Sequence, residues 1–130
     1  MISFIFTTRQ PIRIIFVLIY AMCIVALSLL PMRDLPQIPE FRGFDKLVHF
    51  TMYFIFSTLF CWALKAELNY LWLLLIIPVT VGWGVFMEFM QQRMHLGRNF
   101  DVYDMIANSV GVFIGLLLYL LIARKFSKAY

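Results

Sequence analysis

The chain has 130 residues, of which 63% are hydrophobic and only 14% are charged. Soluble domains carry about 25% charged residues, so this composition excludes an ordinary soluble globular protein. The mean hydropathy is +0.88, and long apolar runs alternate with short polar connections. That pattern is typical of a chain that crosses a membrane several times, and the length leaves room for a single domain over residues 1–130.

The formal net charge of +4 comes from basic residues that lie mainly in the connections and tails. Such residues are expected to face anionic lipid headgroups, so we predict contacts with membrane lipids and no nucleic-acid partner. Cys23 and Cys61 lie within apolar runs and are expected to be buried thiols. Neither cysteine has the spacing of a metal ligand, and we expect no cofactor.

Four apolar windows are long enough to cross a bilayer core, which needs about 20 residues of helix. These windows are Ile12–Leu30, Leu47–Leu64, Tyr70–Met90 and Met105–Ala123. The first is preceded by Arg9 and Arg13, as in a signal peptide, but its apolar run is long for one, and we interpret it as a membrane span. The sequence therefore predicts an all-α membrane protein, a bundle of four transmembrane helices.

Four spans place both termini on one side of the membrane. That side carries six basic residues, Arg9, Arg13, Lys65, Arg124, Lys125 and Lys128. The opposite side carries five, Arg33, Arg42, Lys46, Arg93 and Arg98. If Lys46 and Arg98 serve a functional site, the comparison becomes six against three. The positive-inside rule then favours cytoplasmic termini in a multi-pass membrane protein.

Polar side chains concentrate where the second span starts, the third ends and the fourth starts, all on the side opposite the termini. Within each span they recur at helical spacing, so they share one face. They are Asp45, Lys46, His49 and Tyr53; Glu88, Gln91, Gln92 and His95; and Asp101, Asp104 and Asn108, followed by Gly111 and Gly115. Because each unsatisfied group facing lipid would cost several kcal/mol, we expect one outward-facing polar pocket. The two glycines should let the fourth span approach a neighbour closely.

A purely structural role for these residues is one of two alternatives to a binding site, ranked after an intramembrane enzyme. Asp45 and Asp104 lie near helix starts, where a carboxylate stabilises the helix dipole by about 0.3–1 kcal/mol. Glu88 could pair with Arg98 and hold the bundle together. Glu88 and Asn108 are nevertheless too far inside their spans to be interfacial residues, which favours a functional pocket.

The same residues form a pattern that resembles the VanZ-like family of small bacterial membrane proteins. The matching segments are Asp45-Lys46-x-x-His49-Phe50-x-x-Tyr53, Glu88-x-x-Gln91 and Gly97-Arg98-x-Phe100-Asp101-x-x-Asp104-x-x-x-Asn108-x-x-Gly111-x-x-x-Gly115. Order and spacing fit over residues 44–123, with Leu96 where the family often has Pro. The resemblance implies a set of binding residues: Asp45, Lys46, His49, Tyr53, Glu88, Gln91, Arg98, Asp101, Asp104 and Asn108. The family's namesake is linked to low-level resistance to the glycopeptide teicoplanin, with no reaction assigned.

The first functional hypothesis is a site that binds or modulates an amphiphilic component of the cell envelope. Lys46 and Arg98 would hold a phosphate or carboxylate, and Gln91 and Asn108 would supply neutral hydrogen bonds. The apolar bundle would accept an acyl or prenyl chain. A lipid-linked envelope precursor, a phospholipid or a glycopeptide-related molecule would fit this description.

An intramembrane hydrolase or transferase is the alternative, with His49 beside Glu88 or Asp104 as an acid/base pair. Its weakness is the nucleophile, for which Ser109 is the nearest hydroxyl on the fourth span. A metal site is not predicted, although His49, Glu88, Asp101 and Asp104 are suitable ligand types. A transporter would require a homo-oligomer, because four helices rarely enclose a pathway alone.

Overall fold

The computed structural model describes residues 8–30, 43–94 and 100–127. Within these ranges it contains four helices and no strand: α2 (Gln10–Leu29), α3 (Phe44–Leu64), α4 (Leu71–Arg93) and α5 (Val102–Ser127). Each is long and apolar enough to cross a membrane. The predicted all-α, four-span fold is therefore confirmed. Each predicted window lies within one helix except for its end residues Leu30 and Tyr70.

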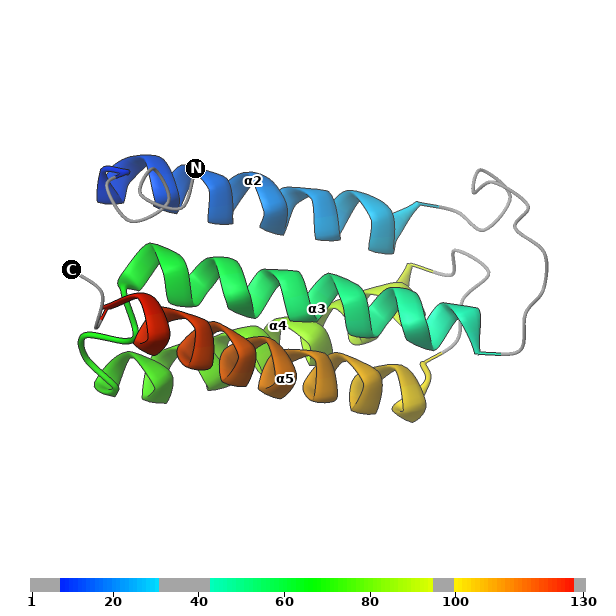
Figure 1. Cartoon of the computed structure of the whole chain (residues 1–130). Coiled ribbons are helices and arrows are strands. Elements are labelled where there is room, and N and C mark those ends of the chain that lie inside the picture. The colour runs from blue at the N-terminus through cyan, green and yellow to red at the C-terminus, as the bar shows by residue number, and fades with distance from the viewer. Residues whose placement is uncertain (1–7, 31–42, 95–99, 128–130) are drawn as a thin grey trace.

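The four helices lie side by side, and their order along the chain decides which ends meet (Figure 1). The starts of α3 and α5 and the ends of α2 and α4 lie at one end of the bundle, here called the site end. The starts of α2 and α4 and the ends of α3 and α5 lie at the opposite end, here called the terminal end. The helix ends that carry the predicted pocket residues are therefore neighbours in space.

A short connection joins α3 to α4 at the terminal end. Lys65 ends α3 in the left-handed region, with φ 50°, and its carbonyl accepts a hydrogen bond from the Leu68 amide at 2.9 Å. Asn69 then accepts a bond from the Leu71 amide through its side-chain oxygen at 3.0 Å. The turn reverses the chain within six residues, so α3 and α4 are antiparallel, as a connection of this length requires.

Gly111 and Gly115 of α5 pack against the backbone of α3. A Cβ atom on Gly111 would overlap the carbonyl oxygen of Phe50, and one on Gly115 would overlap the carbonyl oxygen of Phe54 and the hydroxyl of Ser57. α3 and α5 accordingly share the most extensive contact of any two described helices. The predicted close approach of the fourth span is confirmed, with α3 as its neighbour.

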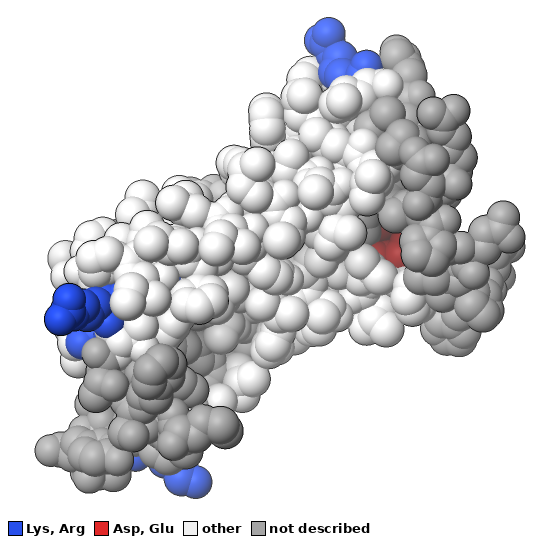
Figure 2. All heavy atoms as spheres, turned by 90° about the horizontal axis from the view of Figure 1, so that it is seen from above, with Lys and Arg blue, Asp and Glu red and all other residues white. Residues whose placement is uncertain are grey.

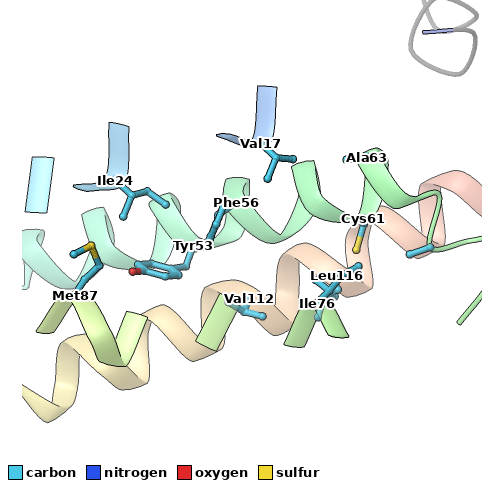
Figure 3. Close-up of a cluster of buried hydrophobic side chains, with 11 residues drawn as sticks. Val17, Ile24, Tyr53, Phe56, Cys61, Ala63, Ile76, Met87, Val112 and Leu116 are labelled. Carbon is cyan, nitrogen blue, oxygen red and sulfur yellow. The ribbon is translucent and has the colours of Figure 1, made fainter. Parts of the chain in front are cut away.

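The buried apolar side chains lie along the middle of the bundle, and α3 supplies the central ones. Figure 3 shows Phe56 of α3 beneath Val17 and Ile24 of α2, with Ile76 of α4 on the other side of α3. Figure 2 shows basic side chains gathered at the two ends and a band without charge between them on the face in view. This distribution matches an apolar bilayer core between two polar interfaces.

The two cysteines differ in environment. Cys61 is fully buried among the core side chains, as predicted. The prediction for Cys23 is wrong, because this thiol is exposed. Cys23 precedes the buried Ile24, and one residue along a helix turns a side chain by about 100°, which directs Cys23 away from the bundle.

Candidate functional site

Eight of the predicted site residues gather at the site end, and they are here called the polar cluster. The polar cluster consists of Asp45, Lys46, His49, Tyr53, Glu88, Asp101, Asp104 and Asn108. They come from α3, α4, α5 and the segment just before α5. Arg98 and His95 lie outside the described residues.

Lys46 lies at the outer edge of the polar cluster, where three carboxylates surround its ammonium group. Its Nζ is 2.6 Å from Asp45, 2.7 Å from Asp101 and 2.9 Å from Oδ1 of Asp104. The hydrogen bond from Lys46 lowers the pKa of the Asp101 carboxyl below its ordinary value. Since the ammonium is already engaged by three anions, the described residues leave Lys46 little positive potential for binding a further anion.

His49 lies one helical turn deeper and contacts both other site helices. Its Nδ1 is 3.1 Å from Oδ1 of Asn108 and 3.7 Å from Oε1 of Glu88, and its Nε2 is 3.6 Å from Oδ2 of Asp104. The His49 side chain is only 12% exposed. The imidazole is therefore the point at which α3, α4 and α5 meet.

Glu88 is a carboxylate buried well inside α4, with 1% of its surface exposed. It lies beside His49 on one side and accepts a long hydrogen bond of 3.5 Å from the Asp101 amide on the other. A buried charge requires compensation by partners, because desolvating a carboxylate costs several kcal/mol. The proposed pair with Arg98 lies outside the described residues, so it stays a prediction.

Tyr53 and Asn108 each bury a polar atom that has no hydrogen-bond partner among the described residues: the Tyr53 hydroxyl and Nδ2 of Asn108. The two side chains are 1% and 2% exposed. A Cβ atom on Gly84 would lie 3.2 Å from both Asn108 Nδ2 and Tyr53 Cε1, so the two groups are neighbours. Figure 3 shows the Tyr53 oxygen pointing toward Met87, the residue before Glu88.

Gly84 belongs to the site although the sequence pattern did not single it out. With only hydrogen on its Cα, it leaves room for the Tyr53 ring and the Asn108 amide against α4. The signal that could have found it is its spacing of four residues before Glu88, which puts both on one face of α4.

Gln91 points away from the polar cluster. Its amide donates a 2.9 Å hydrogen bond to the Ser28 carbonyl at the end of α2, and the side chain is 2% exposed. The contact ties α2 to α4. A role of Gln91 in ligand binding stays a prediction.

The described polar cluster is acidic. Asp45, Glu88, Asp101 and Asp104 contribute four carboxylates, against one ammonium from Lys46 and a titratable imidazole. Carboxylate oxygens accept hydrogen bonds from hydroxyl and ammonium groups and bind hard cations. The cluster is thus suited to sugar-like or cationic groups, and to an anion when a further positive charge is present.

Two triads within the polar cluster have the geometry of metal ligands. His49, Glu88 and Asp104 each offer one ligand atom, and these atoms lie within 4.8 Å of one another. The more exposed set of Asp45, Asp101 and Asp104 meets the same condition. Four of these side chains, His49, Glu88, Asp101 and Asp104, were expected from the sequence to be suitable ligand types, although no metal site was predicted.

The predicted acid/base pair is close together, whereas the candidate nucleophile is engaged by its own helix. The Ser109 hydroxyl donates to the Met105 carbonyl at 2.9 Å. Catalysis by His49 with Glu88 or Asp104 stays a prediction.

A hollow of about 440 Å³ lies at the terminal end, away from the polar cluster. Its lining includes Arg9, Arg13, Lys65 and Trp72. Arg13 is held there by the carbonyl oxygens of Thr8 and Trp62 at 2.6–3.0 Å. Basic and Trp side chains are common at the level of lipid headgroups, so this hollow has the character of a membrane interface.

A family model and one curated protein match the sequence of this chain. The chain matches the model of the family described as VanZ/LLP1 over residues 4–123. The chain belongs to this family. It is also 31% identical over 81 residues to the uncharacterized protein C11E3.10 of Schizosaccharomyces pombe, a match that covers 62% of this chain and 49% of that protein. The matched part of the chain thus spans about half the length of this curated relative. No solved structure matches the present chain. With its four apolar helices, this VanZ-family chain is a multi-pass membrane protein.

Proposed function

We propose that this VanZ-family protein binds the polar head of an amphiphilic cell-envelope component in the polar cluster. The observation that carries the proposal is a pair of buried groups, the Tyr53 hydroxyl and the Asn108 amide nitrogen, that have no hydrogen-bond partner among the described residues. Buried polar groups normally have a hydrogen-bond partner, and both of these can donate to an oxygen atom of a ligand. They lie next to His49 and the carboxylates, which can accept bonds from hydroxyl groups.

The apolar exterior of the bundle supports an amphiphilic ligand. Leu47 on α3, Phe89 on α4 and Ile106 on α5 are all close to half exposed and lie near the site end. A prenyl or acyl chain can extend along such surfaces within the bilayer while its head occupies the polar cluster. A lipid-linked wall precursor has this form, and the family's link to a glycopeptide antibiotic is consistent with it.

The proposed orientation places the polar cluster outside the cell. Among the described basic residues, Arg9, Arg13, Lys65, Arg124 and Lys125 lie at the terminal end, while only Lys46 and Arg93 lie at the site end. Lys46 is engaged by carboxylates, so the positive-inside rule supports a cytoplasmic terminal end.

The test compares Tyr53→Phe with wild type after purification in nanodiscs made from native lipid, followed by mass spectrometry of bound lipids. Tyr53→Phe removes only the unpartnered hydroxyl, so we expect a folded protein that retains about twofold to tenfold less of one amphiphile. Tyr20→Phe is the matched control, because the Tyr20 hydroxyl donates to the Met52 carbonyl inside the bundle. Identical lipid profiles for wild type and Tyr53→Phe would contradict the proposal.

A further inference from the structure

The side chains around His49 offer ligand atoms for a metal ion as well as hydrogen bonds. The Nδ1 atom of His49 lies 3.1 Å from Oδ1 of Asn108. Its Nε2 faces Oδ2 of Asp104 at 3.6 Å. A neutral imidazole can offer a lone pair to a metal ion, and the carboxylates beside it can offer oxygen ligands.

The triad of His49, Glu88 and Asp104 lies in a largely desolvated place. Glu88 is 1% exposed and the Asp104 side chain 13% exposed. Lys46 contacts Oδ1 of Asp104, and His49 faces Oδ2. The triad therefore offers a cation one imidazole and two carboxylates away from bulk water.

The spacing of the triad suits a single divalent ion. Two ligand atoms that each lie about 2.0–2.6 Å from one metal ion are separated by at most about twice that distance. The three ligand atoms of the triad lie within 4.8 Å of one another, which is within this limit. One imidazole and two carboxylates are common ligands of Zn²⁺ and Mn²⁺.

An independent observation indicates where the rest of the ligand lies. Within the part of the chain that the structure describes, the Tyr53 hydroxyl and Asn108 Nδ2 are buried without a hydrogen-bond partner, and Asn108 also contacts His49. An amide NH₂ group is a donor, so it cannot ligate a metal ion but can donate to an oxygen atom bound beside it. Donors on one side and three metal ligands on the other form a site for an oxyanion that shares its charge with the metal ion.

We propose that His49, Glu88 and Asp104 bind a divalent metal ion, and that this ion enables the acidic polar cluster to bind the phosphate group of an amphiphile. Asn108 orients the His49 ring through its Oδ1 atom, in the manner of an outer-shell partner. The Tyr53 hydroxyl and Asn108 Nδ2 donate to the phosphate oxygens. The metal site is inferred from the triad, whereas the phosphate ligand depends on the function proposed above.

The first test is Mn²⁺ binding by the full chain in nanodiscs after removal of metals with a chelator, followed by calorimetry and electron paramagnetic resonance. We expect one Mn²⁺ per chain in wild type and about tenfold or greater weakening in both Glu88→Gln and Asp104→Asn. Glu67→Gln is the matched control, because Glu67 is a carboxylate at the terminal end that accepts a bond from Tyr119.

Thermal unfolding of the metal-free proteins separates lost binding from lost folding. The metal-free Glu88→Gln variant should keep a cooperative unfolding transition and gain no stability when Mn²⁺ is added. Wild type should gain stability with Mn²⁺. Absence of Mn²⁺ and Zn²⁺ binding in wild type, or unchanged binding in Glu88→Gln, would overturn the metal site.

The second test measures binding of dodecyl phosphate and of inorganic phosphate, each with and without Mn²⁺. We expect dodecyl phosphate to bind only when Mn²⁺ is present. Equally strong binding of inorganic phosphate would mean that the site recognises the phosphate group and does not require the dodecyl group. Mn²⁺ binding without any effect on dodecyl phosphate would retain the metal site and overturn its link to the phosphate. Dodecyl phosphate binding that is equally strong without metal would support the proposed function and overturn the role of the ion.

Discussion

At the scale of single residues, the environment of Lys46 differs from the one that its position in the sequence suggested. The sequence presented Lys46 as a cation available to a phosphate, whereas its ammonium lies within 2.9 Å of three carboxylates. Two of these, Asp101 and Asp104, are more than fifty residues away in the chain. Helical spacing cannot reveal such partners, because it orders side chains only within one helix.

The Lys46–Asp101 contact predicts a pH dependence. The pKa of Asp101 is lower in the folded protein than in the unfolded chain, so the contact stabilises the folded state above the ordinary Asp pKa of about 3.9. This stability is lost as the pH falls through the lowered folded pKa. Its size should be modest, because the Asp101 side chain is 35% exposed and such pairs contribute about 0.2–1 kcal/mol after screening by solvent.

Thermal unfolding in detergent at a series of acidic pH values checks this. The unfolding temperature of wild type should fall on acidification, and Asp101→Asn should unfold at a lower temperature at neutral pH and show a shallower fall. Glu67→Gln, at the terminal end, should keep the wild-type slope. An unchanged slope in Asp101→Asn would show that the pair does not contribute to stability.

At the scale of helices, spacing predicted which ends meet but not the direction of every side chain. Glu88 and Gln91 were placed on one face because they are three residues apart. Three residues turn a helix by about 300°, so their side chains diverge by about 60°. That difference directs Glu88 to His49 and Gln91 to the Ser28 carbonyl of α2. The distinction depends on where α2 packs, which the sequence pattern of α4 does not contain.

The contact between α3 and α5 predicts a large difference between two glycines. In Gly111→Ala the new methyl group would overlap the Phe50 carbonyl, so we expect a loss of about 1–3 kcal/mol in the free energy of unfolding. Gly82 has no neighbouring atom within 4 Å of an added Cβ. Gly82→Ala should therefore be neutral, or stabilising by up to about 1 kcal/mol.

Unfolding in mixed micelles with increasing denaturing detergent would measure both free energies under the same conditions. A Gly111→Ala variant as stable as Gly82→Ala would mean that α5 can move away from α3 at no cost. The close contact described here would then not determine the packing of these two helices.

At the scale of the whole molecule, the described part of the chain has an apolar middle and two unlike ends. Composition and window length were sufficient to predict the four spans, because a bilayer requires about 20 apolar residues per helix whatever the packing. Composition and window length do not determine the orientation in the membrane. The predicted orientation depended on setting aside two basic residues, Lys46 and Arg98. The structure gives a reason to set aside Lys46, since its charge is compensated by carboxylates.

Orientation is testable with single cysteines in a Cys23→Ser, Cys61→Ala background. Leu68 at the terminal end and Tyr103 at the site end are similarly exposed, at 67% and 70%. A maleimide that cannot cross membranes should label Tyr103→Cys in intact cells and Leu68→Cys only after the membrane is permeabilised. The reverse pattern would place the polar cluster on the cytoplasmic side.

The glycine contact between α3 and α5 has a geometric consequence for the polar cluster. Asp104, Asn108 and Gly111 lie on the same face of α5, so the backbone contact that holds Gly111 against Phe50 also sets how far α5 can slide along α3. If α5 slipped along α3 by one helical turn, Asn108 would be displaced by about 5.4 Å along the helix axis relative to His49. The spacing between the polar groups of α3 and α5 is therefore set by direct contact between the two main chains.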